Sequence, residues 1–151
     1  RKAGYGCVQV GAPSDRPIQG AVDLRGKMSL LELTAFLSRC AAFVGLDSGV
    51  SYISDSRKTV IGGVDGPFEL PRTPTIVIQG STNPTTSGPI SDRVIHLFAA
   101  ETGYPDCQEI RCHSNCRHES NCITKIGVED VLVELEKVLK SWKEPIPVGV
   151  G

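Results

Sequence analysis

The sequence has few aromatic residues, no excess of either charge and no long apolar run. Aromatic side chains make up 5% of the 151 residues, and 16 lysines and arginines stand against 17 aspartates and glutamates. Without a basic patch interleaved with aromatic residues, no nucleic-acid binding is expected. No stretch of about 18 apolar residues is present, so no transmembrane segment is expected, and nothing is typical of a signal peptide. Because the chain begins at Arg1, we expect it to be a piece of a longer protein.

The length and composition predict one soluble globular domain. A chain of this size buries roughly 70% of its unfolded surface, so its core does not depend on disulfides. We expect an α/β domain over residues 1–142, with a Cys-rich loop at 105–123 and a flexible tail at 143–151. Cys7 and Cys40 lie in apolar surroundings and are predicted to be inert core residues.

Strands and helices are predicted to alternate along the chain. A capping box of Ser29 and Glu32 marks the first helix. The expected strands are 5–10, 21–24, 41–46, 75–79 and 93–98, and the expected helices are 29–40, 48–56 and 128–142. Residues 57–73 are expected to form an exposed excursion, with a strand over 59–64 as the alternative.

Apolar residues recur at helical spacing in two of these helices, and the run 41–46 is continuously apolar. That run predicts a fully buried parallel strand. The expected core residues of the helices are Leu30, Leu31, Leu33, Ala35, Phe36 and Leu37, and Val131, Leu132, Leu135, Val138 and Leu139. Alternation with short loops favours a Rossmann-like, doubly wound and mostly parallel sheet. Ligands bind such sheets beyond the carboxyl ends of the strands, here after residues 10, 46 and 79.

The triad Asp47-Ser48-Gly49 follows the predicted buried strand 41–46. Ser48 suits the N-cap of the next helix, and Gly49 would let a ligand approach the backbone closely. The N–H groups of residues 49–51 would then face a bound anion. From the triad alone, a helix cap and an anion site are about equally supported.

Several ordered pieces resemble family 9 glycosyltransferases, the heptosyltransferases. They are VQVG at 8–11, DLRGK at 23–27, MSL at 28–30, VGLDSG at 44–49, TPTIVI at 73–78 and GSTNP at 80–84. The resemblance implies the C-terminal, donor-binding half of a two-domain GT-B fold. It implies inverting transfer of a sugar, typically heptose, from a nucleotide diphosphate. The base would be supplied by a missing N-terminal domain, so no catalytic residue is expected in this chain.

The resemblance also implies which residues bind the donor. The backbone of the Asp-Ser-Gly turn would hold the diphosphate, Asp47 would contact the sugar, and Met28 would lie against adenine. The implied nucleotide-binding residues are Lys27, Met28, Asp47, Ser48, Gly49, Val50, Ser51 and Tyr52. Tyr52 stands where the family usually has histidine, and a tyrosine does not titrate near neutral pH. Location in the cytoplasm, peripheral to the inner membrane, and a role in lipopolysaccharide or other glycan assembly are implied by the family alone.

Four further cysteines crowd into sixteen residues, at Cys107, Cys112, Cys116 and Cys122. Four thiolates would suit a structural zinc or iron site, whereas disulfides or free thiols are the alternatives. In each case we expect a structural role, with the loop holding the chain before the last helix or mediating assembly, such as a homo-oligomer. A non-catalytic α/β module that binds a nucleotide, or a partner through this loop, is the rival interpretation of the whole chain.

Overall fold

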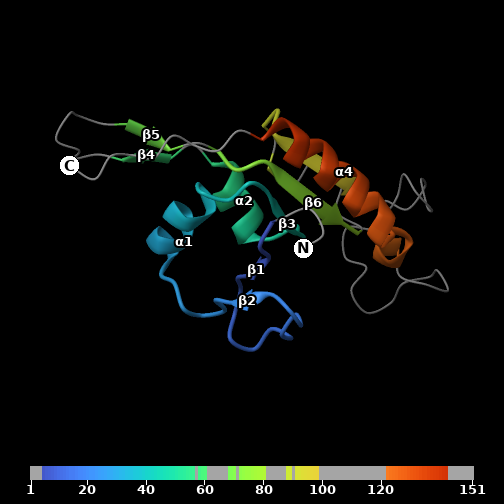
Figure 1. Ribbon diagram of the computed structural model, residues 1–151, viewed down its shortest axis with the longest axis horizontal. Coiled ribbons are helices and arrows are strands. Elements are labelled where there is room, and N and C mark those ends of the chain that lie inside the picture. The colour runs from blue at the N-terminus through green and yellow to red at the C-terminus, as the bar shows by residue number, and fades with distance from the viewer. Residues whose placement is uncertain are drawn as a thin grey trace.

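The computed structural model describes residues 5–56, 58–60, 68–70, 72–80, 88–89, 91–98 and 122–142. Within these residues the elements alternate largely as expected (Figure 1). They are β1 (Val8–Gln9), β2 (Val22–Asp23), α1 (Leu30–Leu37), β3 (Phe43–Leu46), α2 (Gly49–Asp55), β4 (Lys58–Val60), β5 (Phe68–Leu70), β6 (Thr75–Gln79), β7 (Val94–Phe98), the 3-10 helix η1 (Cys122–Lys125) and α4 (Val128–Ser141).

The core is a three-stranded parallel sheet in the order β3-β6-β7. Leu46 of β3 pairs with Ile78 of β6, so the two strands end at the same edge. Ile76 and Val77 are neighbours on β6 and both are 0% exposed. Because neighbouring residues of a strand point to opposite faces, both faces of this central strand are covered. The α/β, Rossmann-like fold class predicted from the sequence is confirmed.

Helices cover the two faces of β6. The hydroxyl of Ser54 on α2 lies 2.6 Å from that of Thr75, so α2 covers the face of Thr75 and Val77. α4 contacts β6 and β7 and runs along the sheet on the side away from α2 (Figure 1). At the end of α4, the ring of Trp142 meets Tyr5 edge-on, with 6.4 Å between ring centroids.

β1 and β2 form a separate two-stranded parallel pair. The strand expected over 5–10 is wrong in length, since only Val8–Gln9 is assigned, and Val8 is exposed although the run is apolar. Cys7 is likewise exposed rather than a core residue. The physical reason is that, among the described strands, β1 pairs with β2 alone, so its apolar side chains lack the cover of the central sheet.

The apolar runs also overstate burial at β3 and on the helices. Val44 is 38% and Leu46 58% exposed, because β3 is an edge strand of the three-stranded sheet. On α1 the capping box is confirmed, but Leu31 is 83% exposed and only Leu37 is buried. Leu30 and, on α4, Leu132 are exposed as well, whereas Val138 is buried. Periodicity therefore located the helices but overestimated the width of their buried faces.

The segment after α2 contains an antiparallel pair, β4 with β5, which extends away from the central sheet (Figure 1). The predicted exposed excursion is thus partly a hairpin-like ladder, with Thr59 opposite Glu69. No helix in the described part of the chain is long and apolar enough to cross a membrane.

Candidate functional site

The Asp47-Ser48-Gly49 turn joins β3 to α2 at the carboxyl edge of the central sheet. Ser48 is the N-cap of α2 in an extended conformation, as the sequence predicts. Because β3 and β6 are parallel and in register to Leu46 and Ile78, the loop after β6 begins beside this turn. The turn therefore lies at the edge where doubly wound sheets bind ligands.

The capping of α2 does not use the Ser48 side chain. Ser48 makes no side-chain cap bond; instead its N–H donates to Ser51 Oγ at 3.3 Å. Ser51 Oγ donates in turn to the Ser48 carbonyl at 2.6 Å, and Ser51 is fully buried. The Ser51 N–H also donates to that carbonyl, at 3.0 Å. Ser51 is thus engaged in the helix start, while Ser48 is exposed with a hydroxyl that does not cap the helix.

Among the described residues, nothing in the fold requires glycine at position 49. Its φ is not in the left-handed region, and a Cβ built there would meet no atom within 4 Å. The residue is exposed, and with Val50 it opens the first turn of α2. The N–H groups of a first turn have no carbonyl acceptor within their own helix. The backbone of Gly49 and Val50 is consequently arranged so that an anion can approach it.

Tyr52 lies one turn further along α2 and is 45% exposed. Its hydroxyl accepts a hydrogen bond from the Gly88 N–H at 2.7 Å. Asp47 is half-buried at the end of β3. The structure thus brings Asp47, Ser48, Gly49 and Tyr52 together within the turn and the first helical turns that follow it.

Lys27 and Met28 lie on a different loop, which leads from β2 into α1. Lys27 is exposed and Met28 half-buried, and the next residue, Ser29, caps α1. α1 contacts α2, so the two loops precede neighbouring helices. The capping box is closed by Ser29 N donating to Glu32 Oε2 at 2.7 Å, and this backbone hydrogen bond lowers the pKa of Glu32.

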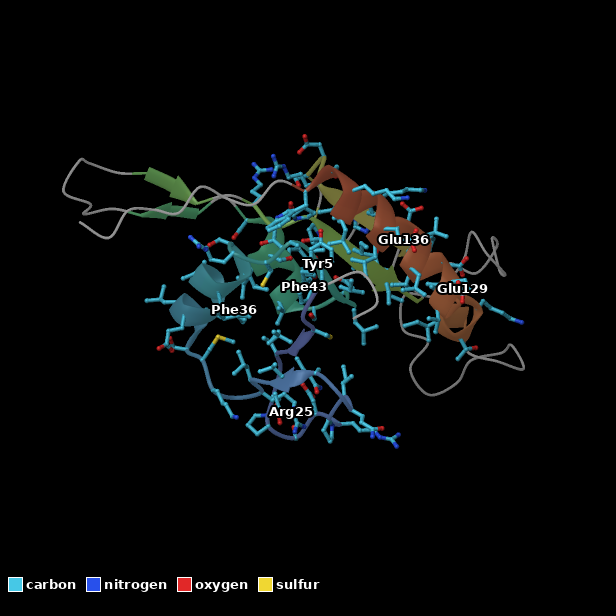
Figure 2. All side chains as sticks on the ribbon, in the orientation of Figure 1. Tyr5, Arg25, Phe36, Phe43, Glu129 and Glu136 are labelled. Atoms are coloured by element: carbon cyan, nitrogen blue, oxygen red, sulfur yellow. The ribbon has the colours of Figure 1, made fainter. Side chains whose placement is uncertain are left out.

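A clamp of Arg25 and Asp23 shapes the chain ahead of Lys27. The guanidinium binds the Asp23 carboxylate twice, through Nε and Nη2 at 2.9 Å each, and also donates to the Asp15 carbonyl. The side-chain hydrogen bond from Arg25, followed by the one from its backbone N–H, holds the pKa of Asp23 well below its usual range. Figure 2 shows Arg25 at the end of the β1–β2 unit that lies away from α4. The hydrogen bonds within the DLRG stretch, and from it to Asp15, therefore stabilise the loop in which it lies.

Gly26 is required by this loop. Its φ is 64°, in the left-handed region, and a Cβ there would lie 2.4 Å from Pro13 Cγ. Its N–H donates to the Gly11 carbonyl at 2.9 Å, which extends the pairing of β1 with β2. Gly26 and Gly49 thus differ: the fold explains the first glycine and does not explain the second.

Sequence reasoning missed a group of residues between β6, β7 and α2. Gly88 is buried with a φ of 107°, and a Cβ there would come within 3.1 Å of both Gln79 Nε2 and His96 Cε1. His96 Nδ1 lies 2.6 Å from Gln79 Oε1, and His96 Nε2 lies 2.9 Å from the Pro89 carbonyl. The Gly88-Pro89 dipeptide is a turn signal in the sequence, but nothing there indicated that it meets Tyr52.

The predicted metal site falls outside the described residues. Cys107, Cys112 and Cys116 are not described, and of Cys122 only the backbone, in η1, is described. Elsewhere in the described ranges, no group of three or more His, Cys, Asp or Glu side chains is placed to hold a metal ion.

Residues 7–64 match the family model described as glycosyltransferase family 9 (heptosyltransferase). The resemblance to glycosyltransferase family 9 is confirmed. The matched family 9 segment contains both loops of the candidate site, with Lys27 and Met28 on the first and residues 47–52 on the second.

A solved structure is similar over most of the chain. It is the crystal structure of the glycosyl transferase family 9 from Veillonella parvula DSM 2008, with a TM-score of 0.68 and 21% identity. The similarity covers 93% of this chain and 38% of that one, so the chain spans well under half the length of its family 9 neighbour. At this identity the likeness supports the fold. No curated protein matches the chain.

Proposed function

We propose that the chain is the donor-binding part of an inverting glycosyltransferase of the heptosyltransferase type. The observation that carries the proposal is the turn after β3, where exposed Ser48 and Gly49 have features that folding does not explain. Ser48 does not cap α2 with its side chain, and no described residue makes glycine conformationally or sterically necessary at position 49. The match of residues 7–64 to the family 9 model supports the same conclusion.

In this proposal the turn binds the diphosphate of a nucleotide-sugar donor. The N–H groups of Gly49 and Val50 would donate to phosphate oxygens, with the Ser48 hydroxyl as a further donor. Asp47 would accept from a sugar hydroxyl, because a carboxylate beside a phosphate repels it. Lys27 would supply a positive charge, and Met28 would lie against the base, since a thioether adapts to a flat ring.

The chemistry would be shared with a preceding domain of the GT-B type. That domain would supply the base that deprotonates the acceptor hydroxyl, while this chain stabilises the leaving diphosphate electrostatically. The neighbour's additional length leaves room for such a domain. We therefore expect the isolated chain to bind the donor nucleotide weakly and to transfer nothing.

The donor we propose is ADP-heptose, with a role in lipopolysaccharide or other glycan assembly. The protein would act in the cytoplasm, at the surface of the inner membrane. These finer assignments rest on the family resemblance, and the nucleotide is the part most directly tested with this chain.

Calorimetric titration with ADP tests the proposal. We expect wild-type chain to bind at micromolar to millimolar ADP and Gly49→Val to lose binding, because the new side chain occupies the path of the phosphate. Gly6→Val is the matched control: Gly6 is also exposed, has no left-handed φ and has no atom within 4 Å of a built Cβ. Absence of binding by wild-type chain at millimolar ADP, or equal binding by Gly49→Val, would contradict the proposal.

For the four-cysteine loop we propose a structural metal site, with zinc or iron bound by Cys107, Cys112, Cys116 and Cys122. A site with four sulfur ligands leaves no position for substrate, so its role would be to hold the loop before α4. Plasma mass spectrometry of purified protein, combined with a thiol count under denaturing conditions, distinguishes metal, disulfides and free thiols.

A further inference from the structure

Helix α2 begins at the Asp47-Ser48-Gly49 turn, which we name the donor turn. The helix is hydrogen-bonded at two points to the segment after β6. Tyr52 and Asp55 are three residues apart on the helix, and their partners Gly88 and Ser91 are three residues apart on the other segment. The Gly88 N–H donates to Tyr52 Oη at 2.7 Å. Ser91 donates to Asp55 through its hydroxyl and through its N–H, the latter at 3.4 Å. We name these four residues the α2 clasp.

The opposite side of the clasped segment is held by the sheet. Gly88 is enclosed so closely that a Cβ would come within 3.1 Å of Gln79 and of His96. The carbonyl of the next residue, Pro89, lies 2.9 Å from His96 Nε2, and His96 Nδ1 lies 2.6 Å from Gln79 Oε1. Gln79 ends β6 and His96 lies on β7, so residues 88 and 89 are fixed between two strands and one helix.

The clasp runs along α2 from Tyr52, one turn after the donor turn, to Asp55 near the opposite edge of the sheet, where Thr75 begins β6 and Val94 begins β7. Leu46 pairs with Ile78, one residue before Gln79, and the donor turn follows Leu46 directly. Tyr52 therefore joins the helix that begins at the donor turn to the segment that follows the neighbouring strand. Tyr52 is 45% exposed, and a phenol that accepts one hydrogen bond still has its O–H to donate.

We propose that Tyr52 is a positioning residue of the donor site, whose hydroxyl fixes residues 88 and 89 against the helix that begins at the Asp47-Ser48-Gly49 turn and so sets the geometry that a nucleotide diphosphate meets. This inference rests on the proposed function for its ligand, but not for the contact itself. It gives Tyr52 a role of its own at the position where family 9 usually has histidine.

The test compares Tyr52→Phe with Tyr5→Phe in the purified chain. The second variant makes the same chemical change at a similarly exposed tyrosine whose ring contacts Trp142. In Tyr52→Phe we expect amide hydrogen exchange at Gly88 to become about tenfold faster or more, and ADP affinity to fall about five- to tenfold. Tyr5→Phe should match wild type in both measurements, and the Gly88 amide resonance should shift when ADP is added to wild type.

The two measurements distinguish the Tyr52–Gly88 hydrogen bond from its effect on ADP binding. If amide exchange at Gly88 is unchanged in Tyr52→Phe, the Tyr52–Gly88 hydrogen bond does not hold this segment and the inference is wrong. Faster exchange with unchanged ADP affinity shows that the contact is structural only, and overturns the positioning role. If wild type and Tyr5→Phe also fail to bind ADP, the proposed function fails together with the ligand role, and the exchange rates still show whether the clasp exists.

Discussion

Gly49 and Gly26 show why a glycine has to be interpreted through its surroundings. Both stand in motifs that resemble family 9, and the sequence does not show which of the two glycines the backbone requires. In the structure, Gly26 has a left-handed φ and lies against Pro13, whereas Gly49 has neither constraint. A glycine that folding does not need is a better candidate for ligand approach than one that the backbone demands.

Alanine substitutions should therefore act in opposite directions at these two positions. We expect Gly49→Ala to raise the free energy of unfolding by about 0.4–1 kcal/mol, because alanine restricts the unfolded chain and fits the helix. Gly26→Ala should lower it by about 1–3 kcal/mol, because of its φ and the contact with Pro13. Urea unfolding of both variants measures the difference; destabilisation by Gly49→Ala would mean that position 49 is constrained by the fold after all.

The ion pair of Asp23 and Arg25 predicts that the free energy of unfolding depends on pH. Because the folded pKa of Asp23 lies below the unfolded value of about 3.9, the ionised carboxylate stabilises the fold above that value. This contribution is lost as pH falls through the folded pKa. We expect the stability difference between wild type and Asp23→Asn to be constant from neutral pH to about pH 5 and to shrink below pH 4.

Urea unfolding at a series of pH values measures this difference, with Asp15→Asn as a comparison outside the bidentate pair. A difference between wild type and Asp23→Asn that grows on acidification would show that the pairing with Arg25 does not stabilise the folded state. Because both side chains reach solvent, added salt should reduce the difference as well.

At the scale of elements, α2 is fixed to the sheet by hydroxyl groups rather than by a wide apolar stripe. Ser54 and Thr75 are fully buried, and their hydroxyls lie 2.6 Å apart. Backbone carbonyls lie near both hydroxyls, with Ser51 O 2.8 Å from Ser54 Oγ and Thr73 O 2.9 Å from Thr75 Oγ1. Because a hydroxyl has one proton, one of the two donates to the other, which in turn donates to its own carbonyl. No hydrophobic periodicity in the sequence indicates this contact.

Removing either hydroxyl should weaken the docking of α2. We expect Ser54→Ala and Thr75→Val each to lower the free energy of unfolding by about 1–2 kcal/mol, because a buried hydrogen bond is lost. The double variant should cost less than the sum of the two, since both changes remove the same contact. Denaturant unfolding of the four proteins provides the cycle, and strictly additive losses would show that the two hydroxyls do not interact. Ser56→Ala, at an exposed position, is the control.

The positions of most elements were predictable, because they follow from local patterns. The Ser29–Glu32 capping box, the buried run of β6 and the turn after β3 all lie where the sequence placed them. The extent of burial was not, because a strand's exposure depends on its neighbours. Leu46 and Val77 belong to similar apolar runs, yet one lies on an edge strand and is 58% exposed while the other is fully buried.

At the scale of the whole molecule, the described strands divide into a covered sheet and a less protected pair. The β3-β6-β7 sheet has helices on both faces, whereas β1 and β2 pair only with each other. A two-stranded pair with few buried contacts opens at a lower free energy than a covered core.

Native-state hydrogen exchange should resolve this division. We expect the amides of Val22 and Leu24, which donate to Cys7 and Gln9, to exchange at least tenfold faster than those of Ile76 and Val77 on the central strand. Equal protection in the two groups would show that the pair and the central sheet unfold as one unit. Ile76→Ala should lower the global free energy of unfolding by about 2–5 kcal/mol. It should therefore reduce the difference in exchange rate between the two groups of amides.

By itself, the sequence determined the order of strands and helices, the fold class and the resemblance to family 9, since periodicity, caps and short motifs are local properties. The tertiary structure decided which apolar residues are buried and which motif residues remain available. It showed that the Ser51 side chain, and not that of the N-cap residue Ser48, is hydrogen-bonded at the start of α2. It also showed that Gly49 is unconstrained among the described residues where Gly26 is not, and that Tyr52 contacts Gly88, 36 residues away. Such contacts depend on how distant segments come together, and no local pattern records them.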